Sequence, residues 1–566
     1  MKKDKLIIYQ VLPRLFGNGK DTRKKNGTLD ENGVGKLSDF DEKALSGIKD
    51  MGFTHIWYTG VLEHATQTDY SQYGIKKDHP DVVKGMAGSP YAIKDYYDIC
   101  PDLADEIDRR IEEFEDLVSR SHNAGLKVII DFVPNHVARQ YHSDKKPEGV
   151  KDFGEDDNKG VGFVSTNNFY YCPNQRLELG TADVYRAGGY VEFPTKVTGN
   201  DCFTNHPSVN DWYETVKLNY GVDYLNGRTP HFDPVPDTWL KMKDILLYWA
   251  AKGVDGFRCD MMEMVPVEFW AWVIPHVRGK YENILFIGEA YDNKLYWNYI
   301  FNGKFDYLYD KVDLYDTMRD VICGHKPTSE ITFSWQRTEH VQPYMLNFLE
   351  NHDEQRIASD FFAGCAEKAI PALHVLTFMN TNPMMIYFGQ ELGEKGMDEE
   401  GFSGRDGRTT IFDYWSVDSV MIWRNEGKFD GADLSEEQKL LRKQYVTALK
   451  VANDEECIAE GAFYDLMYAN YENENFDSAK QYVFLRSKGD AFLLVVSNFS
   501  DRKADITVRI PQEAFSYIGI DPEEIKLGKE LLSRKKITLN NIDLLQEIPL
   551  SVEAYNSVVV KFSKNK

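Results

Sequence analysis

Short apolar runs alternate with longer amphipathic stretches from the N-terminus to residue 388. This alternation is typical of parallel strands that are buried on both faces and joined by crossover helices. The clearest helix precedes the third run, where Phe114, Leu117 and Val118 fall at helical spacing and Gly125 follows at the expected end. Eight strands are predicted, at Leu6–Pro13, His55–Gly60, Lys127–Val133, Val254–Cys259, Ile284–Gly288, Phe305–Tyr309, Met345–Leu349 and Met384–Phe388. The pattern therefore predicts an α/β fold, a (β/α)8 TIM barrel.

Two parts of the chain depart from this alternation. Roughly ninety residues, 136–225, follow the third strand and are rich in Gly, Asn, Asp and Tyr, far more than a barrel loop needs. Toward the C-terminus, β-rich runs such as Ala491–Asn498 are separated by turn residues. We therefore expect a barrel made of residues 1–135 and 226–465, an inserted domain at 136–225, and a C-terminal antiparallel β-sandwich at 466–566.

The charge of the chain narrows its possible partners. A formal net charge of −24 repels phosphate polyanions and anionic membrane surfaces, whereas a neutral ligand such as a sugar is indifferent to it. We therefore expect no nucleic acid and no membrane as partner. No run approaches the roughly 20 apolar residues that a membrane span needs. The sequence carries no signal of oligomeric state.

The cysteines and the N-terminal segment indicate the cellular compartment of the protein. The seven cysteines are odd in number, scattered, and lack CxxC spacing, which argues against a disulfide framework and against a zinc site. The first apolar run is interrupted by Gln10 and has no small-residue cleavage site. We therefore expect a cytoplasmic protein.

Four segments each place a carboxylate at the C-terminal end of a predicted strand. They are Asp131–His136, Gly256–Asp260, Phe286–Tyr291 and Phe348–Asp353. In (β/α)8 enzymes, catalytic residues from separate strands converge at that rim. One such acid more often only caps the following helix. Four acids with Arg258, His136 and His352 beside them indicate a shared site.

At these segments the chain resembles the α-amylase family, glycoside hydrolase family 13, and the similarity extends in the same order over nearly the whole chain. Further matches are Tyr9–Pro13, Gly52–Trp57, Ser89–Ile93 and Asn498–Ser500. The resemblance implies that the insertion and the C-terminal sandwich are the family's domains B and C. It also implies a retaining hydrolase that cleaves α-glucans such as starch, maltodextrins and maltooligosaccharides, with α-1,4 bonds expected, through a covalent glycosyl-enzyme intermediate.

By the same resemblance, Asp260 is the nucleophile, Glu289 the general acid/base, and Asp353 a third carboxylate that binds sugar hydroxyls. This chemistry needs one carboxyl that stays protonated near neutrality and one that stays ionised. Arg258 lies on the same face of its strand as Asp260 and would hold it ionised. Glu289, close to two other acids, would have a raised pKa and carry the proton.

The remaining site residues are also implied by the resemblance. His136 and His352 would bind sugar hydroxyls, and Tyr91 would stack on the sugar ring. A lone histidine is more often a core residue, but these two stand beside strand-end acids. Asp131 would brace Arg258, a structural role.

The match to the family weakens at its calcium site. The family often has a histidine four residues after the nucleophile, whereas Met264 stands there in this chain. Asn135 matches a calcium-binding asparagine, and Asp183 and Asp201 offer hard oxygen ligands. Acidic loops are usually only solvated, so we expect no required cofactor, with Ca²⁺ at Asn135 as the alternative. Glu263 would instead contact the sugar on the leaving-group side.

Two other functions stay open. A maltodextrin transglycosylase or glucanotransferase uses the same covalent intermediate and transfers it to another glucan hydroxyl. A non-catalytic carbohydrate-binding relative would have lost its acids, whereas Asp260, Glu289 and Asp353 are all present. Fold alone would not exclude that second alternative.

Overall fold

The barrel is closed. The computed structural model describes residues 5–180, 188–208, 210–533, 536–538 and 547–564. Eight parallel strands form a ring in which β1 pairs with both β2 and β16. They are β1 (Ile7–Val11), β2 (His55–Tyr58), β5 (Lys127–Phe132), β12 (Gly256–Cys259), β13 (Leu285–Gly288), β14 (Tyr307–Tyr309), β15 (Met345–Phe348) and β16 (Met384–Tyr387). Each lies within one of the predicted runs, which confirms the (β/α)8 fold.

Helices lie between consecutive barrel strands, and a long one follows the last. They include α3 (Glu42–Lys49), α4 (Arg110–Asn123), α5 (Asp237–Ala251), α6 (Val267–Arg278), α7 (Asp316–Ile322), α8 (Glu330–Thr338), α9 (Ile370–Phe378) and α11 (Glu436–Asp454). In α4, Phe114, Leu117 and Val118 are buried as their spacing predicts. Gly125 then adopts φ 77° and donates its N–H to the His122 carbonyl, which ends the helix before β5.

Strand alternation explains how the barrel positions polar groups. Large apolar side chains, among them Ile8, Ile129 and Ile287, pack inside the ring. Residues two positions further along a strand face the same side. Asp131 therefore follows Ile129 on the inner side, at the carboxyl end of the barrel, and Glu289 follows Ile287 in the same way. A filled barrel thus presents its carboxylates at one rim.

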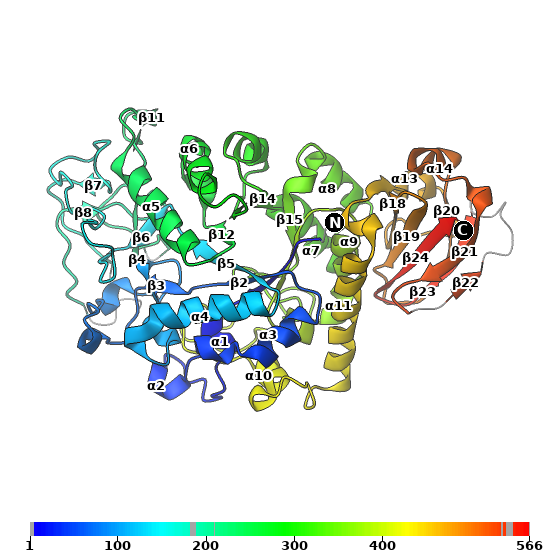
Figure 1. Ribbon diagram of the computed structural model, residues 1–566, viewed down its shortest axis with the longest axis horizontal. Coiled ribbons are helices and arrows are strands. Elements are labelled where there is room, and N and C mark those ends of the chain that lie inside the picture. The colour runs from blue at the N-terminus through cyan, green and yellow to red at the C-terminus, as the bar shows by residue number, and fades with distance from the viewer. Residues whose placement is uncertain (1–4, 181–187, 209, 534–535, 539–546, 565–566) are drawn as a thin grey trace.

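Domain B occupies one end of the molecule (Figure 1). Its described residues form three short antiparallel pairs and long irregular connections. The pairs are β6 (His136–Ala138) with β9 (Thr215–Lys217), β7 (Tyr171–Cys172) with β8 (Thr195–Lys196), and β10 (Val222–Asp223) with β11 (Thr229–Pro230). The last strand, β11, lies just beyond residue 225, where the insertion was expected to end. The hairpin of β3 (Leu62–His64) and β4 (Ile93–Ile99), which follows β2, packs against β6.

The C-terminal domain lies at the opposite end (Figure 1). Its main antiparallel sheet has the order β17-β18-β19-β24-β21-β22, and β20 pairs with β23. These strands are β17 (Ala462–Asp465), β18 (Gln481–Lys488), β19 (Ala491–Asn498), β20 (Ala504–Arg509), β21 (Ile525–Glu530), β22 (Lys536–Thr538), β23 (Glu547–Val552) and β24 (Asn556–Lys564). The predicted C-terminal β-domain is therefore confirmed. All seven cysteines are unpaired. Among the described residues, the helices are too short or too polar to cross a bilayer.

Candidate active site

Arg258 is the centre of the candidate site. Its guanidinium is buried among side chains from neighbouring strands, and the residue pairs in register with Asp131 of β5. Nη1 lies 2.8 Å from Asp260 Oδ1 and 3.6 Å from Asp131 Oδ1. Nη2 lies 2.7 Å from Glu289 Oε1. One guanidinium thus contacts three of the acids that the sequence placed at the rim.

The carboxyl groups of Asp260 and Glu289 influence each other in opposite directions. Burial raises the pKa of Asp260, while the charge of Arg258 and hydrogen bonds from Arg258 and Glu289 lower it. Burial also raises the pKa of Glu289; there Arg258 lowers it and the charge of Asp260 raises it further. The interaction of the two carboxyls therefore favours a proton on Glu289 over one on Asp260, the division that an acid and a nucleophile need.

Glu289 is held by two donors from its own surroundings. The N–H of Met261 donates to Oε2 at 2.8 Å, and the hydroxyl of Tyr291 donates to Oε1 at 2.9 Å. Met261 has φ 43°, a left-handed conformation that is costly for a non-glycine residue. The sequence reasoning missed Tyr291, although a residue two positions after Glu289 can share its face.

The third carboxylate belongs to a separate hydrogen-bonded group. Asp353 Oδ2 lies 3.0 Å from His352 Nε2, and the Tyr91 hydroxyl lies 2.5 Å from the same nitrogen. The amide of Gln10 lies 2.8 Å from His352 Nδ1 and donates to it, so Nε2 carries the proton. Burial and the charge of Glu289 raise the pKa of Asp353 to about 8. Because 40% of this side chain is exposed, we expect solvent to reduce the shift.

Tyr91 is the aromatic residue expected to contact the sugar. It is half-buried, and its ring stacks on that of His352 with centroids 5.2 Å apart. Three aromatic rings, those of Trp57, Tyr91 and Tyr309, lie 5.3 to 5.4 Å from the Arg258 guanidinium. Trp57 also donates to Asp131, and Arg258 donates to the Tyr309 hydroxyl. Trp57 and Tyr309 were missed because aromatic residues in strands look like ordinary core.

His136 lies with Asn135 at the start of domain B. It is buried, burial lowers its pKa to about 4, and its ring lies 5.2 Å from that of Trp212. Glu263 lies apart from the Arg258 contacts: its Oε2 accepts from the backbone N–H groups of Tyr291 and Asp292 at 3.1 Å each. Glu263 thus holds the segment that follows Glu289.

The residues around Asn135 do not fit calcium. Asn135 Oδ1 accepts a 2.8 Å hydrogen bond from Lys217 Nζ, and the same ammonium lies 2.6 Å from Asp201 Oδ1. Lys217 is buried, and Asn135 Nδ2 donates a hydrogen bond to the carbonyl of Gly199. Oxygens that would coordinate a metal are therefore bonded to a cation that the chain itself supplies. Asp183, the other expected ligand, lies outside the described residues.

Comparison with known proteins identifies the family of the barrel. The catalytic-domain profile of the α-amylase family matches residues 10–441. α-Amylase 3 of Dictyoglomus thermophilum is 23% identical over 405 residues, 69% of this chain and 64% of that protein. Neopullulanase 2 of Thermoactinomyces vulgaris is 21% identical over 406 residues, 69% of this chain and 57% of that protein. The chain thus spans less than two thirds of the length of these relatives.

Solved structures share the fold. A maltogenic α-amylase, AmyB, of Thermotoga neapolitana has a TM-score of 0.62 and 20% identity, with 100% of both chains covered. An α-amylase of Geobacillus thermoleovorans, complexed with acarbose, has a TM-score of 0.63 and 17% identity, also with 100% of both chains covered. Because the catalytic-domain match extends over residues 10–441, more than half of the chain, this chain belongs to the α-amylase family, glycoside hydrolase family 13.

Proposed function

We propose that the protein is a retaining glycosidase that hydrolyses α-glucans, with Asp260 as nucleophile and Glu289 as general acid/base. One observation carries the proposal: both carboxyls contact the same guanidinium, Asp260 at 2.8 Å from Arg258 Nη1 and Glu289 at 2.7 Å from Arg258 Nη2. An inverting enzyme needs roughly 6.5–9.5 Å between its carboxyls to hold a water. Retaining enzymes hold their carboxyls closer, at roughly 5–5.5 Å. Two carboxyls that bind neighbouring nitrogens of one guanidinium suit this shorter spacing, which favours a covalent intermediate.

The reaction then has two balanced steps. In the first, Asp260 attacks the anomeric carbon while Glu289 gives its proton to the glycosidic oxygen, so the bond to the leaving sugar breaks. In the second, Glu289 takes a proton from water, and the resulting hydroxide displaces Asp260 from the carbon. Two inversions give net retention. Arg258 stabilises the carboxylate form of Asp260 before the first step and again when the second step releases it.

The other expected residues bind the sugar in this proposal. Asp353 and the protonated Nε2 of His352 would contact neighbouring hydroxyls of one sugar. The two groups are close enough for this, because Asp353 Oδ2 lies 3.0 Å from His352 Nε2. Tyr91 stacks beside them on the sugar ring, and His136 contacts the same sugar from domain B. Glu263 lies on the leaving-group side, where it fixes the backbone after Glu289.

Product analysis tests the proposed activity. We would incubate the protein with starch, maltohexaose, pullulan, isomaltose and sucrose, with Asp260→Asn as the inactive control, and separate the products by chromatography. We expect maltooligosaccharides from starch and maltohexaose, because a family member with this acid pair acts on α-glucosidic bonds, and α-1,4 bonds are the proposed linkage. Failure to degrade any of the five substrates would contradict the proposal and favour a non-catalytic binding protein.

The same assay addresses the alternative of transfer. A maltodextrin transglycosylase would form products longer than maltohexaose when acceptor concentration is raised, because a glucan hydroxyl replaces water in the second step. We propose hydrolysis as the main outcome, so shortened products should dominate. Predominance of longer products would reassign the protein to transglycosylation.

Two further proposals concern cofactor and compartment. We propose that catalysis requires no cofactor and that Lys217 takes the place of Ca²⁺ beside Asn135, supported by its contacts with Asn135 and Asp201. We propose a reducing compartment, the cytoplasm, because the chain carries seven free thiols and three of them, Cys202, Cys323 and Cys365, are partly exposed. Exposed thiols oxidise outside such a compartment.

A further inference from the structure

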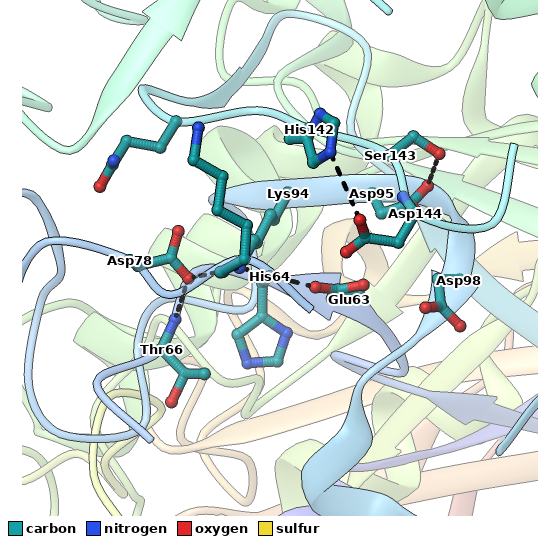
Figure 2. A network of polar contacts seen from close by, with 12 residues as sticks. Glu63, His64, Thr66, Asp78, Lys94, Asp95, Asp98, His142, Ser143 and Asp144 are labelled. Carbon is teal, nitrogen blue, oxygen red and sulfur yellow. Dashed lines mark hydrogen bonds and ion pairs between the residues drawn. The ribbon is translucent and has the colours of Figure 1, made fainter. Parts of the chain in front are cut away.

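The buried acids of the β3–β4 hairpin have partners within the chain. Asp95 accepts from the Ser143 hydroxyl at 2.6 Å, and Lys94 Nζ lies 3.0 Å from Asp78 Oδ2 (Figure 2). These contacts fix β4 to the segments around it, which is a structural role. Glu263 differs, because its hydrogen bonds lead to the residue that acts as acid/base in the proposed function.

The turn after β12 carries Glu263 and is held at both ends. Its first residue, Asp260, donates its N–H at 2.9 Å to a carbonyl of the neighbouring strand β5. The short helix η6 (Met262–Met264) follows. At the far end, the hydroxyl of the buried Tyr299 lies 2.9 Å from the Val265 carbonyl oxygen and 3.2 Å from that of Glu263. The backbone of Glu263 is therefore fixed relative to the barrel.

Glu263 holds a segment that has no regular structure of its own. Residues 289–292 follow β13 and belong to neither a helix nor a strand. One carboxylate oxygen of Glu263, Oε2, accepts from the N–H groups of Tyr291 and Asp292 at 3.1 Å each. Two donors from adjacent peptide groups that meet at one oxygen restrict the rotation of both groups. Tyr291 is therefore held at its backbone by Glu263.

Both oxygens of Glu289 are in turn held by these residues. The Met261 N–H, from the same turn as Glu263, donates to Oε2 at 2.8 Å, and the Tyr291 hydroxyl donates to Oε1 at 2.9 Å. Oε1 also lies 2.7 Å from Nη2 of Arg258. Since a cation and a hydroxyl donor face Oε1, we expect the proton that Glu289 transfers to be on Oε2. A carboxyl that is held at both oxygens keeps this proton in one direction.

We propose that Glu263 is a positioning residue for proton transfer by Glu289 and that it acts through Tyr291. The proposal rests on the function proposed above. In the first step, the proton moves from Oε2 of Glu289 to the glycosidic oxygen as the bond to the leaving group breaks. Loss of Glu263 would free the segment that carries Tyr291, so the Glu289 carboxyl would lose one of its two fixed ends. Misplacing a catalytic group by about 1 Å can cost about 10²-fold in rate, so a smaller shift should be measurable.

Aryl α-maltosides test the proposal, because their leaving group can be varied with no sugar on the leaving-group side. Phenolate leaves poorly without protonation, whereas 4-nitrophenolate needs little, and kcat/KM reports the step that breaks this bond. In Glu263→Leu, kcat/KM should fall about tenfold on phenyl α-maltoside but about twofold or less on 4-nitrophenyl α-maltoside. Glu263→Gln keeps an oxygen that can accept from both N–H groups, so it should retain most of the wild-type rate on both. The matched control is Glu268→Leu, at an exposed acid in the first turn of α6, which should equal the wild type.

The ratio of the two kcat/KM values does not depend on how much of a variant is folded, so a less stable Glu263→Leu still gives an answer. A double variant with Tyr291→Phe should lose no more on phenyl α-maltoside than Glu263→Leu alone, because the two residues act in series. Equal losses on both maltosides, losses that multiply in the double variant, or a Glu263→Gln as slow as Glu263→Leu would overturn the proposal while leaving the proposed function intact. Wild-type protein inactive on both maltosides would instead contradict the proposed function and the role of Glu263 with it.

Discussion

At the scale of single residues, Arg258 explains why buried acids can coexist at this rim. Its guanidinium contacts Asp131, Asp260 and Glu289. From the sequence, Arg258 is expected only to hold Asp260 ionised. The structure adds a second role, because the same cation lowers the pKa of Glu289 against the effect of burial. The pKa values of Asp260 and Glu289 therefore depend on each other as well as on Arg258.

Burial is the largest influence on the pKa of Glu289, and Tyr291 is one of the groups that lower it. Its hydroxyl donates to Glu289 Oε1, and this bond lowers the pKa of that carboxyl. Tyr291→Phe removes the donor, so the pKa of Glu289 should rise. Since Glu289 must be protonated to act as acid, activity falls as pH rises through its pKa. The alkaline limb of kcat/KM should therefore move to higher pH.

A matched control separates this effect from loss of folding. Tyr517→Phe changes a tyrosine of the C-terminal domain that is 60% exposed, and its pH profile should equal that of the wild type. A lowered but unshifted profile for Tyr291→Phe would mean that Tyr291 acts through packing alone.

At the scale of elements, strand patterning predicted most of the barrel. All eight runs contain a strand, because apolar residues buried on both faces leave a strong local signal. The helix α4 and its end at Gly125 were also predicted from a local sequence signal. The contact of Lys217 with Asn135 was not predictable, because it depends on how an irregular insertion returns to the barrel. Tyr291 was missed for a related reason, since its partner is decided by the turn after β13.

The buried helix α9 contains a group that should make stability depend on pH. All of its residues are buried, and His374 Nδ1 has no hydrogen-bond partner. Burial lowers the pKa of His374 to about 3. Between that value and the ordinary histidine pKa of about 6.5, the unfolded chain binds a proton that the folded chain does not. Folding stability should therefore decrease as pH falls through this window.

Replacing His374 should remove its contribution to the pH dependence of folding stability. In His374→Leu, the loss of unfolding free energy between pH 7 and pH 4.5 should be smaller than in the wild type by about 2–3 kcal/mol. Urea unfolding at the two pH values measures the difference. His325→Leu, at an exposed histidine, should lose as much as the wild type. Equal losses in all three proteins would show that His374 is not kept neutral by burial.

At the scale of the whole molecule, internal cations connect domain B to the barrel. Lys217 links Asn135, just after β5, to Asp201 of the insertion. In Lys217→Met the Asp201 carboxylate loses its cation while the shape is nearly kept. Since Asp201 is only 25% exposed, the unfolding free energy should fall by about 3 kcal/mol.

A double variant provides the control for this link. Lys217→Met with Asp201→Asn removes both charges, so urea unfolding should show a smaller loss than for Lys217→Met alone. Equal losses would mean that Lys217 contributes through packing and not as the cation beside Asn135.

The central claim is that Asp260 forms a covalent bond to the sugar while Glu289 manages protons. It is tested most directly by giving Glu289→Gln an α-maltosyl fluoride, whose leaving group needs little protonation. The first step should stay comparatively fast and the second should stall without a base, so mass spectrometry of quenched protein should find maltosyl mass on the peptide containing Asp260. Sugar mass on the Glu289 peptide of the wild type, or a first product of inverted anomeric configuration, would contradict the account.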